Sequence, residues 1–230
     1  MIVDAIIPAL DEEATVGRVV RAILGGSAVR TVVVVDNGSR DATAEVARAA
    51  GAEVVSEPRR GYGAACLAGI AHAAARAEPC HVLVFLDGDL SDDSADVARL
   101  LEPIARGAAD LVIGSRTRGA EPGALTPQQR AGNAVAVAVI RALYGHRYTD
   151  LGPLRAIRLS SLVSLGMVDR DYGWTVEMQV KALRRGLRVV EVPVGYRRRA
   201  GGKSKVSGTL RGTIGAGWKI LTTIARHARG

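Results

Sequence analysis

The chain has 230 residues, of which 48% are hydrophobic and 23% charged, so its length and composition predict one or at most two folded domains and exclude a disordered protein. Only 3% of the residues are aromatic, which argues against single-stranded nucleic-acid binding through base stacking. The net charge is +8, and residues 181–230 hold 13 lysines and arginines against one acidic residue, so this end predicts an anionic partner: a phosphate ester, an anionic membrane surface or nucleic acid.

Segments with strand and helix character alternate through the first half of the chain. We expect strands at 2–8, 31–36, 52–56, 81–87 and 110–114, and helices at 13–25, 41–50, 63–77 and 93–106. Asp41 is expected to cap the second of these helices, and Ser91 or Asp92 the fourth. The alternation predicts an α/β fold with a doubly wound, mainly parallel sheet flanked by helices.

The second half begins with a loop rich in glycine and proline. The elements expected there are a loop at 117–127, helices near 127–145 and 173–186, a strand at 188–194, and a basic loop at 196–205. No linker separates the two halves.

A last, amphipathic helix is predicted at 206–227. Its apolar residues recur at helical spacing and share one face: Val206, Leu210, Ile214, Trp218, Leu221 and Ile224. Basic residues also lie along it, so the helix either packs on the core, which is slightly favoured, or lies in the plane of an anionic membrane. The same face is compatible with a homodimer.

Polar and acidic residues follow three of the predicted strands, at 8–12, 36–39 and 87–89. Ligands of such sheets bind beyond the carboxyl ends of the strands, so we expect these residues to converge on one crevice. Asp87 and Asp89 have the spacing to share one Mg²⁺, although Asp-Gly is also a strong turn signal, and the spacing alone leaves both interpretations open. Asp36 is placed for a base or ribose contact, or equally for a helix-entry turn.

Two glycine-containing segments are weak candidates for phosphate binding. The run 59–65 lacks the spacing of a dinucleotide fingerprint, so a simple loop is favoured there. Gly202-Lys203-Ser204 is not a P-loop, because Arg197 stands where the first glycine of that motif is required.

Cysteine usage and hydropathy indicate a cytoplasmic protein. Cys66 and Cys80 form neither a disulfide framework nor a metal cluster, which favours a reducing compartment. Asp4 and the acidic run at 10–13 are unlike a signal peptide, and no apolar run approaches the ~20 residues that a membrane span needs.

Nine short motifs, in order along the chain, resemble those of family 2 glycosyltransferases with the GT-A fold. The first five are IIPALDEE (6–13), VVDNGSRDAT (34–43), RRGYGAACLAG (59–69), FLDGDL (85–90) and VIGSR (112–116). The other four resemble the branch of dolichyl-phosphate mannose or glucose synthases and related bacterial enzymes: DLGPLRAIR (150–158), YGWTVEM (172–178), EVPVGYRRR (191–199) and GGKSKVSG (201–208). The resemblance implies a single domain over 1–230, with a nucleotide-sugar-binding half at 1–116 and an acceptor-binding half at 117–230.

The resemblance also implies roles for individual residues. The nucleotide sugar would be bound by Pro8, Leu10, Glu12, Val35, Asp36, Asn37, Gly61, Asp87, Gly88 and Asp89. Asp87 and Asp89 would hold Mg²⁺ or Mn²⁺. The acceptor would be bound by Arg116, Arg130, Asp150, Trp174, Glu177, Lys203 and Lys205, and the catalytic set would be Asp87, Asp89, Arg116 and Lys203. In the synthases the motif usually reads Asp-Ala-Asp with a glutamine two residues on. Gly88 and Ser91 stand here instead, which removes a third metal contact.

The activity implied is metal-dependent, inverting transfer of a hexose from a nucleotide sugar, UDP-glucose or GDP-mannose, to a polyprenyl phosphate. Metal and basic side chains would offset the charge that develops on the leaving diphosphate. A phosphate acceptor is already anionic and needs no general base, and none of the four histidines stands in a convincing base position. The site would then lie at the cytoplasmic face of a membrane.

Three other functions fit parts of the sequence. The main alternative keeps the fold and donor but uses a hydroxyl acceptor, a small molecule or a glycan. A sugar-nucleotide pyrophosphorylase is disfavoured, because it would need a glycine-rich basic signature where this chain has residues 8–12. A specific nucleic-acid binder is disfavoured by the acidic strand ends and the scarcity of aromatic residues.

Overall fold

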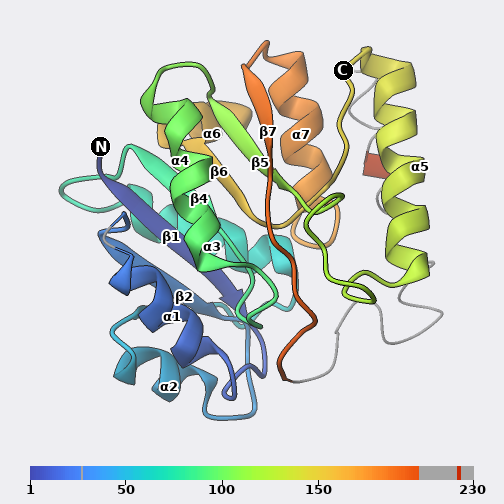
Figure 1. The fold of residues 1–230 in the computed structure, drawn as a ribbon. Coiled ribbons are helices and arrows are strands. Elements are labelled where there is room, and N and C mark those ends of the chain that lie inside the picture. The colour runs from blue at the N-terminus through green and yellow to red at the C-terminus, as the bar shows by residue number, and fades with distance from the viewer. Residues whose placement is uncertain (27, 202–221, 224–230) are drawn as a thin grey trace.

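The computed structural model describes residues 1–26, 28–201 and 222–223, and in these residues seven strands form one sheet in the order β3-β2-β1-β4-β6-β5-β7 (Figure 1). The strands are β1 (Val3–Ala9), β2 (Thr31–Asp36), β3 (Glu53–Ser56), β4 (Val82–Phe85), β5 (Leu111–Ser115), β6 (Arg155–Arg158) and β7 (Val189–Pro193). The helices are α1 (Val16–Gly25), α2 (Thr43–Ala49), α3 (Tyr62–Ala74), the 3₁₀ turn η1 (Ser94–Asp96), α4 (Val97–Ala105), α5 (Pro127–Tyr144), α6 (Leu159–Leu165) and α7 (Trp174–Arg184).

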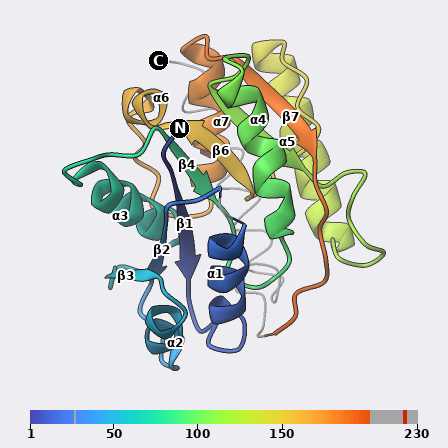
Figure 2. The ribbon, with the colours of Figure 1, turned by 60° about the vertical axis from the view of Figure 1, so that its left-hand side comes forward.

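The centre of the sheet is buried on both faces. Side chains 32–35 of β2 are fully buried, as the unbroken β-branched run predicts for a strand covered from both sides. Alternate side chains of each central strand enter two core clusters, one completed by α1, α2 and α4 and the other by α3, α5, α6 and α7. Figure 2 shows the result, with α3 and α1 on opposite sides of β1. The predicted doubly wound α/β fold is confirmed.

Two elements were not predicted, β6 and α6. β6 pairs antiparallel with both β4 and β5, so it lies between these two strands in the sheet. The reason is local composition: β6 has only four residues, and Arg155 and Arg158 give it neither an apolar run nor a simple alternation. The sheet nevertheless stays mainly parallel, because the other four pairings are parallel.

The helix-capping predictions were partly wrong. The side chain of Asp93, rather than Ser91 or Asp92, caps the turn before α4 by accepting from the backbone N–H of Ala95 at 3.1 Å. Asp41 does accept from the backbone N–H of Thr43 at 3.1 Å, but α2 begins one residue later than this cap requires. Ser91 and Asp92 are thereby free to serve the segment that follows β4.

The last predicted helix, 206–227, lies outside the described residues except for Thr222 and Thr223, which are helical. Lys203 and Lys205 also lie outside them. Among the described helices, none combines the length and the hydropathy that crossing a membrane requires.

Candidate active site

A cavity of about 730 Å³ opens beyond the carboxyl ends of β1, β2 and β4. This is the size range of small-molecule and cofactor sites. It brings together nine of the predicted site residues: Pro8, Leu10, Glu12, Asn37, Gly61, Asp87, Gly88, Asp89 and Arg116. The opposite wall is built from the second half of the chain and includes Thr126, Leu151, Thr175 and Tyr196.

Asp87 and Asp89 follow β4 at the floor of this cavity. The backbone N–H of Asp87 donates to Asp92 Oδ2 at 3.1 Å, which fixes the turn. Asp89 Oδ1 accepts from the backbone N–H of Ser91 at 2.9 Å and also from its hydroxyl, while Asp89 Oδ2 accepts from Arg199 Nε at 2.8 Å. The backbone of Asp87 and the carboxylate of Asp89 are therefore both fixed at one edge of the sheet.

Negative charge accumulates at this floor. Burial, together with the neighbouring carboxylates of Asp92 and Asp89, raises the pKa of Asp87 well above its ordinary range. Burial also raises the pKa of Asp92 to about 7, and Asp92 Oδ1 is buried without a hydrogen-bond partner. A hard divalent cation fits such a pair of oxygen donors and would relieve this repulsion.

The protein offers that cation only part of a coordination shell. Within residues 1–26, 28–201 and 222–223, no group of three or more His, Cys, Asp or Glu side chains is arranged to bind a metal ion. Two carboxylates leave the other positions to ligand oxygens and water, which is how Mg²⁺ is commonly bound beside phosphates. The donor set therefore suits a cation that arrives with a phosphate-bearing ligand.

The raised pKa of Asp92 makes a stability prediction for the metal-free protein. Between about pH 4 and pH 7 the folded state binds more protons at Asp92 than the unfolded state, so stability falls as pH rises through this window. Asp92→Asn cannot titrate, and we expect its free energy of unfolding relative to that of wild type to rise by about 4 kcal/mol across the window and then level off. Urea unfolding at several pH values in EDTA measures this. Glu102→Gln, in an exposed ion pair on α4, is the control; a constant difference between wild type and Asp92→Asn would contradict the prediction.

Arg116 reaches the cavity from the end of β5 and is held rigidly by Asp150. Its Nε and Nη2 donate to the two Asp150 carboxylate oxygens at 2.7 and 2.8 Å, and its backbone N–H donates to Oδ2 at 2.8 Å. The guanidinium also lies over the ring of Tyr196, 4.9 Å from its centroid. Asp150 was expected to touch the acceptor, but it is only 1% exposed and lies behind Arg116 rather than on the cavity wall.

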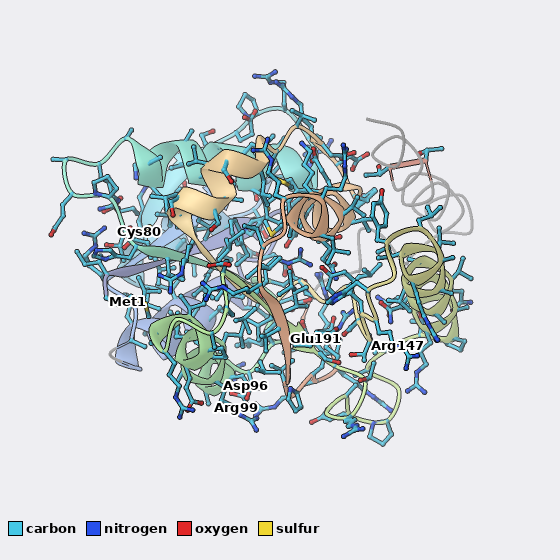
Figure 3. The ribbon with its side chains drawn as sticks, turned by 90° about the horizontal axis from the view of Figure 1, so that it is seen from above. Met1, Cys80, Asp96, Arg99, Arg147 and Glu191 are labelled. Atoms are coloured by element: carbon cyan, nitrogen blue, oxygen red, sulfur yellow. The ribbon has the colours of Figure 1, made fainter. Side chains whose placement is uncertain are left out.

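The segment that carries Asp150 is itself fixed from several elements. Glu191 of β7, labelled in Figure 3, accepts from the backbone N–H groups of Thr149 and Asp150. Asn133 of α5 accepts from the backbone N–H of Leu151 at 2.9 Å, and Gln179 of α7 donates to the Asp150 carbonyl at 3.1 Å. Arg116 is therefore a preorganised cation facing into the cavity.

Asn37 and Gly61 shape the side of the cavity across from Arg116, where the nucleotide sugar is predicted to bind. The Asn37 amide donates to the carbonyls of Glu57 and Arg59 at 2.9 and 2.7 Å and accepts from the backbone N–H of Gly61 at 2.8 Å. Gly61 has a φ of +140°, and a Cβ there would meet the Arg170 carbonyl oxygen at 2.1 Å. The glycine is required by this close approach of two backbones.

Besides Asp150, five predicted site residues do not line the cavity: Val35, Asp36, Arg130, Trp174 and Glu177. Val35 is fully buried in the core, and Arg130 is exposed on α5 away from the cavity lining. Trp174 is 0% exposed and packs on Phe85, with ring centroids 4.9 Å apart. Glu177 is also fully buried, where it accepts from the backbone N–H of Asp169 at 2.7 Å.

Asp36 does not line the cavity either. Its carboxylate accepts from the backbone N–H of Ser39 at 3.1 Å, as the helix-entry turn predicts.

Arg199 is a site residue that the sequence patterns did not predict. Its Nη1 donates to Glu12 Oε1 at 3.0 Å while its Nε donates to Asp89, so one guanidinium joins two predicted donor-site carboxylates. Arg199 lies in the run 191–199, which the sequence offers only as a basic segment and as a motif that resembles those of the dolichyl-phosphate sugar synthases. No local pattern distinguishes Arg199 from Arg197 and Arg198, which pair with Asp93 and the Pro122 carbonyl outside the cavity lining.

Comparison with known proteins bears on this site. Residues 4–163 match the sequence model of the family described as "Glycosyl transferase family 2". A glycosyltransferase of Mycobacterium tuberculosis is 40% identical over 224 residues, which is 96% of this chain and 98% of that protein. Polyprenol monophosphomannose synthase of Mycolicibacterium smegmatis is 32% identical, with 89% of this chain and 80% of that protein covered.

Solved structures show the same fold. The crystal structure of Mycobacterium tuberculosis glucosyl-3-phosphoglycerate synthase in complex with Mn²⁺, UDP-glucose and phosphoglyceric acid has a TM-score of 0.78 at 24% identity. The similarity covers 99% of this chain and 79% of that one. Nearly the whole chain is therefore matched by the fold of that structure.

Proposed function

The chain belongs to glycosyltransferase family 2, and from that premise we propose that it transfers a hexose from a nucleotide sugar to a polyprenyl phosphate with inversion at the anomeric carbon. The observation that carries the proposal is one cavity with the carboxylates of Asp87 and Asp89 on its floor and the fixed guanidinium of Arg116 on its wall. The predicted family, GT-A fold and enzyme class are confirmed by the comparisons.

The donor side of the cavity would bind the nucleotide sugar. Asp87 and Asp89 would hold a divalent cation, Mg²⁺ or Mn²⁺, which when bound offsets the negative charge that develops on the departing diphosphate. Pro8, Leu10 and Asn37 line the part of the cavity nearest β1 and β2, where the nucleoside would lie. UDP-glucose is favoured as a donor by the solved complex described above, and GDP-mannose by the mannose-transferring relatives.

Arg116 would bind the acceptor phosphate on the other wall. An oxygen of that phosphate attacks the anomeric carbon while the bond from this carbon to the diphosphate oxygen breaks, and the nucleoside diphosphate leaves. The acceptor oxygen is already ionised, so no proton has to be removed. This agrees with the absence of histidine from the cavity lining over the part of the chain that the structure describes.

The relatives support a lipid-linked acceptor. One is named undecaprenyl-phosphate mannosyltransferase, from Micrococcus luteus, and is 34% identical over 79% of this chain. We therefore also propose that the protein works at the inner face of the membrane, with the basic end of the chain, including Lys203 and Lys205, near anionic lipid phosphates. The homodimer predicted from the last helix stays a prediction.

A small-molecule hydroxyl acceptor is the second candidate. The observation that favours it is the fold shared with glucosyl-3-phosphoglycerate synthase, which was crystallised with phosphoglyceric acid. A hydroxyl acceptor would need a general base, and Asp171 is a carboxylate of the cavity lining that is not assigned to the cation.

Ligand-dependent thermal unfolding tests the donor proposal. We expect one nucleoside diphosphate, UDP or GDP, to stabilise the protein with Mn²⁺ or Mg²⁺ and to do so weakly in EDTA, because cation and diphosphate share the cavity floor. At a ligand concentration of ~100 Kd, the gain is about 2.7 kcal/mol, or roughly 5–10 °C in Tm. Stabilisation equal in EDTA and in metal would contradict the cation assignment.

The acceptor is tested by incubating the protein with a labelled nucleotide sugar, of the nucleotide that stabilises it, and with either undecaprenyl phosphate or 3-phosphoglycerate. We expect labelled sugar to appear in the lipid fraction only. Transfer to 3-phosphoglycerate alone would overturn the polyprenyl-phosphate acceptor and leave the donor proposal intact.

A further inference from the structure

The guanidinium of Arg199 occupies the same carboxylate that a divalent cation would use. Asp89 is 4% exposed, and its Oδ2 accepts from Arg199 Nε at 2.8 Å. The other end of the guanidinium reaches Glu12, which is 6% exposed, at 3.0 Å. A positive charge is thus already bound between two buried carboxylates on the cavity floor.

The backbone around Arg199 holds it there. The N–H of Ala200 donates to the Asp89 carbonyl at 3.2 Å, and the N–H of Arg197 donates to the Ser91 carbonyl at 2.8 Å, so this segment runs beside the segment after β4. The side chain of Arg197 strengthens the contact by pairing with Asp93 at 2.6 Å. Arg199 is consequently not a surface side chain that happened to meet an acid.

A divalent cation and this guanidinium compete for one carboxylate. Asp89 Oδ1 already accepts from Ser91, and Oδ2 holds Arg199, so a cation that binds both aspartates has to displace the guanidinium or share an oxygen with it. Two like charges in one partly desolvated site repel each other strongly. A divalent cation that binds Asp89 without an anionic ligand therefore leaves Arg199 without this carboxylate. An anionic ligand that arrives with the cation offers Arg199 a new partner.

We propose that Arg199 is the resident cation of the donor site: it occupies Asp89 and Glu12 in the ligand-free protein and couples divalent-cation binding to the binding of an anionic ligand. The proposal rests on the proposed function for the cation at Asp87 and Asp89. It makes Arg199 a positioning residue whose single positive charge offsets part of the negative charge of the two buried carboxylates until the ligand enters.

The test is a titration of the full chain with Mn²⁺ in the absence of nucleotide, in which the electron paramagnetic resonance signal of free Mn²⁺ measures binding. We expect Arg199→Gln to bind Mn²⁺ at least 5-fold more tightly than wild type, because the competing charge is gone, where each tenfold change corresponds to about 1.4 kcal/mol. Arg198→Gln removes the same charge from the same segment, but Arg198 bonds the Pro122 carbonyl outside the cavity lining, and this variant is expected to bind Mn²⁺ within 2-fold of wild type.

A second titration with saturating UDP or GDP tests the coupling. The nucleotide is expected to tighten Mn²⁺ binding more in wild type than in Arg199→Gln, since only wild type has a guanidinium to release. If Arg199→Gln does not fold, Arg199→Lys and Arg199→Met replace it. Arg199→Lys keeps a positive charge at the site and is expected to bind Mn²⁺ as wild type does. Arg199→Met removes the charge and is expected to bind Mn²⁺ more tightly than wild type.

Failure of the inference and failure of the proposed function give different results. If Mn²⁺ binds wild type and Arg199→Gln equally, or the variant more weakly, the resident-cation role is wrong while the metal site stands. If no variant and no nucleotide produces Mn²⁺ binding, the metal assignment itself is wrong, and the role of Arg199 falls with it.

Discussion

Replacing Asp87 and Asp89 together with alanine is expected to lower sugar transfer by at least ~10³-fold and to leave the protein folded. A bound cation supplies several kcal/mol of transition-state stabilisation, and each ~1.4 kcal/mol is worth a factor of ten in rate. The fold should survive, because burial and neighbouring carboxylates already raise the pKa of Asp87, which marks its charge as unfavourable in the ligand-free protein. Radiolabelled transfer and urea unfolding measure the two effects.

The control for this variant is Asp93→Ala. Asp93 follows the same strand but lies outside the cavity lining, where it caps η1 and pairs with Arg197. We expect it to lose stability, by about 1 kcal/mol, and to keep its activity. If the double variant transfers sugar at close to the wild-type rate, neither Asp87 nor Asp89 takes part in the reaction.

Arg116→Lys is expected to lower kcat/KM for the polyprenyl-phosphate acceptor by about 10²-fold, without weakening the binding of nucleoside diphosphate and Mn²⁺. Lysine keeps the charge but lacks the planar fork, so it cannot reproduce the paired contacts to both Asp150 oxygens at 2.7 and 2.8 Å. The cation then loses its fixed direction into the cavity, and about 2.7 kcal/mol of acceptor positioning is lost. Steady-state kinetics at varied acceptor, with donor saturating, measure this.

The matched control is Arg141→Lys, an exposed arginine in the last turn of α5 that does not line the cavity. It is expected to leave kcat/KM unchanged. If Arg116→Lys instead weakens donor binding and leaves the acceptor KM untouched, Arg116 belongs to the donor diphosphate, and the acceptor wall must be sought elsewhere in the cavity.

The sequence by itself determined the sheet core and the floor of the site. Strands buried on both faces need unbroken apolar runs, so β1, β2 and β4 could be located from composition alone. Parallel strands end at one edge, so Asp87, Asp89 and Asn37 could be predicted to converge before any coordinates were known. These predictions depend only on patterns within short segments and on one rule of topology.

Only the tertiary structure decided what most of the other polar residues do. Trp174, Glu177 and Asp150 stand in motifs whose resemblance implies ligand contact, yet each is buried against another part of the protein. Their partners are the ring of Phe85, the backbone N–H of Asp169 and the guanidinium of Arg116, respectively. Arg199 has the same chemistry as Arg197, and it belongs to the site because the segment after β7 lies beside residues 89–91. β6 likewise becomes a strand only through its pairing with β4 and β5. The physical reason is common to all of them: the role of a polar side chain is set by which charge or hydrogen-bonding group lies within about 3 Å of it, and those neighbours are brought together by folding rather than by adjacency in the chain.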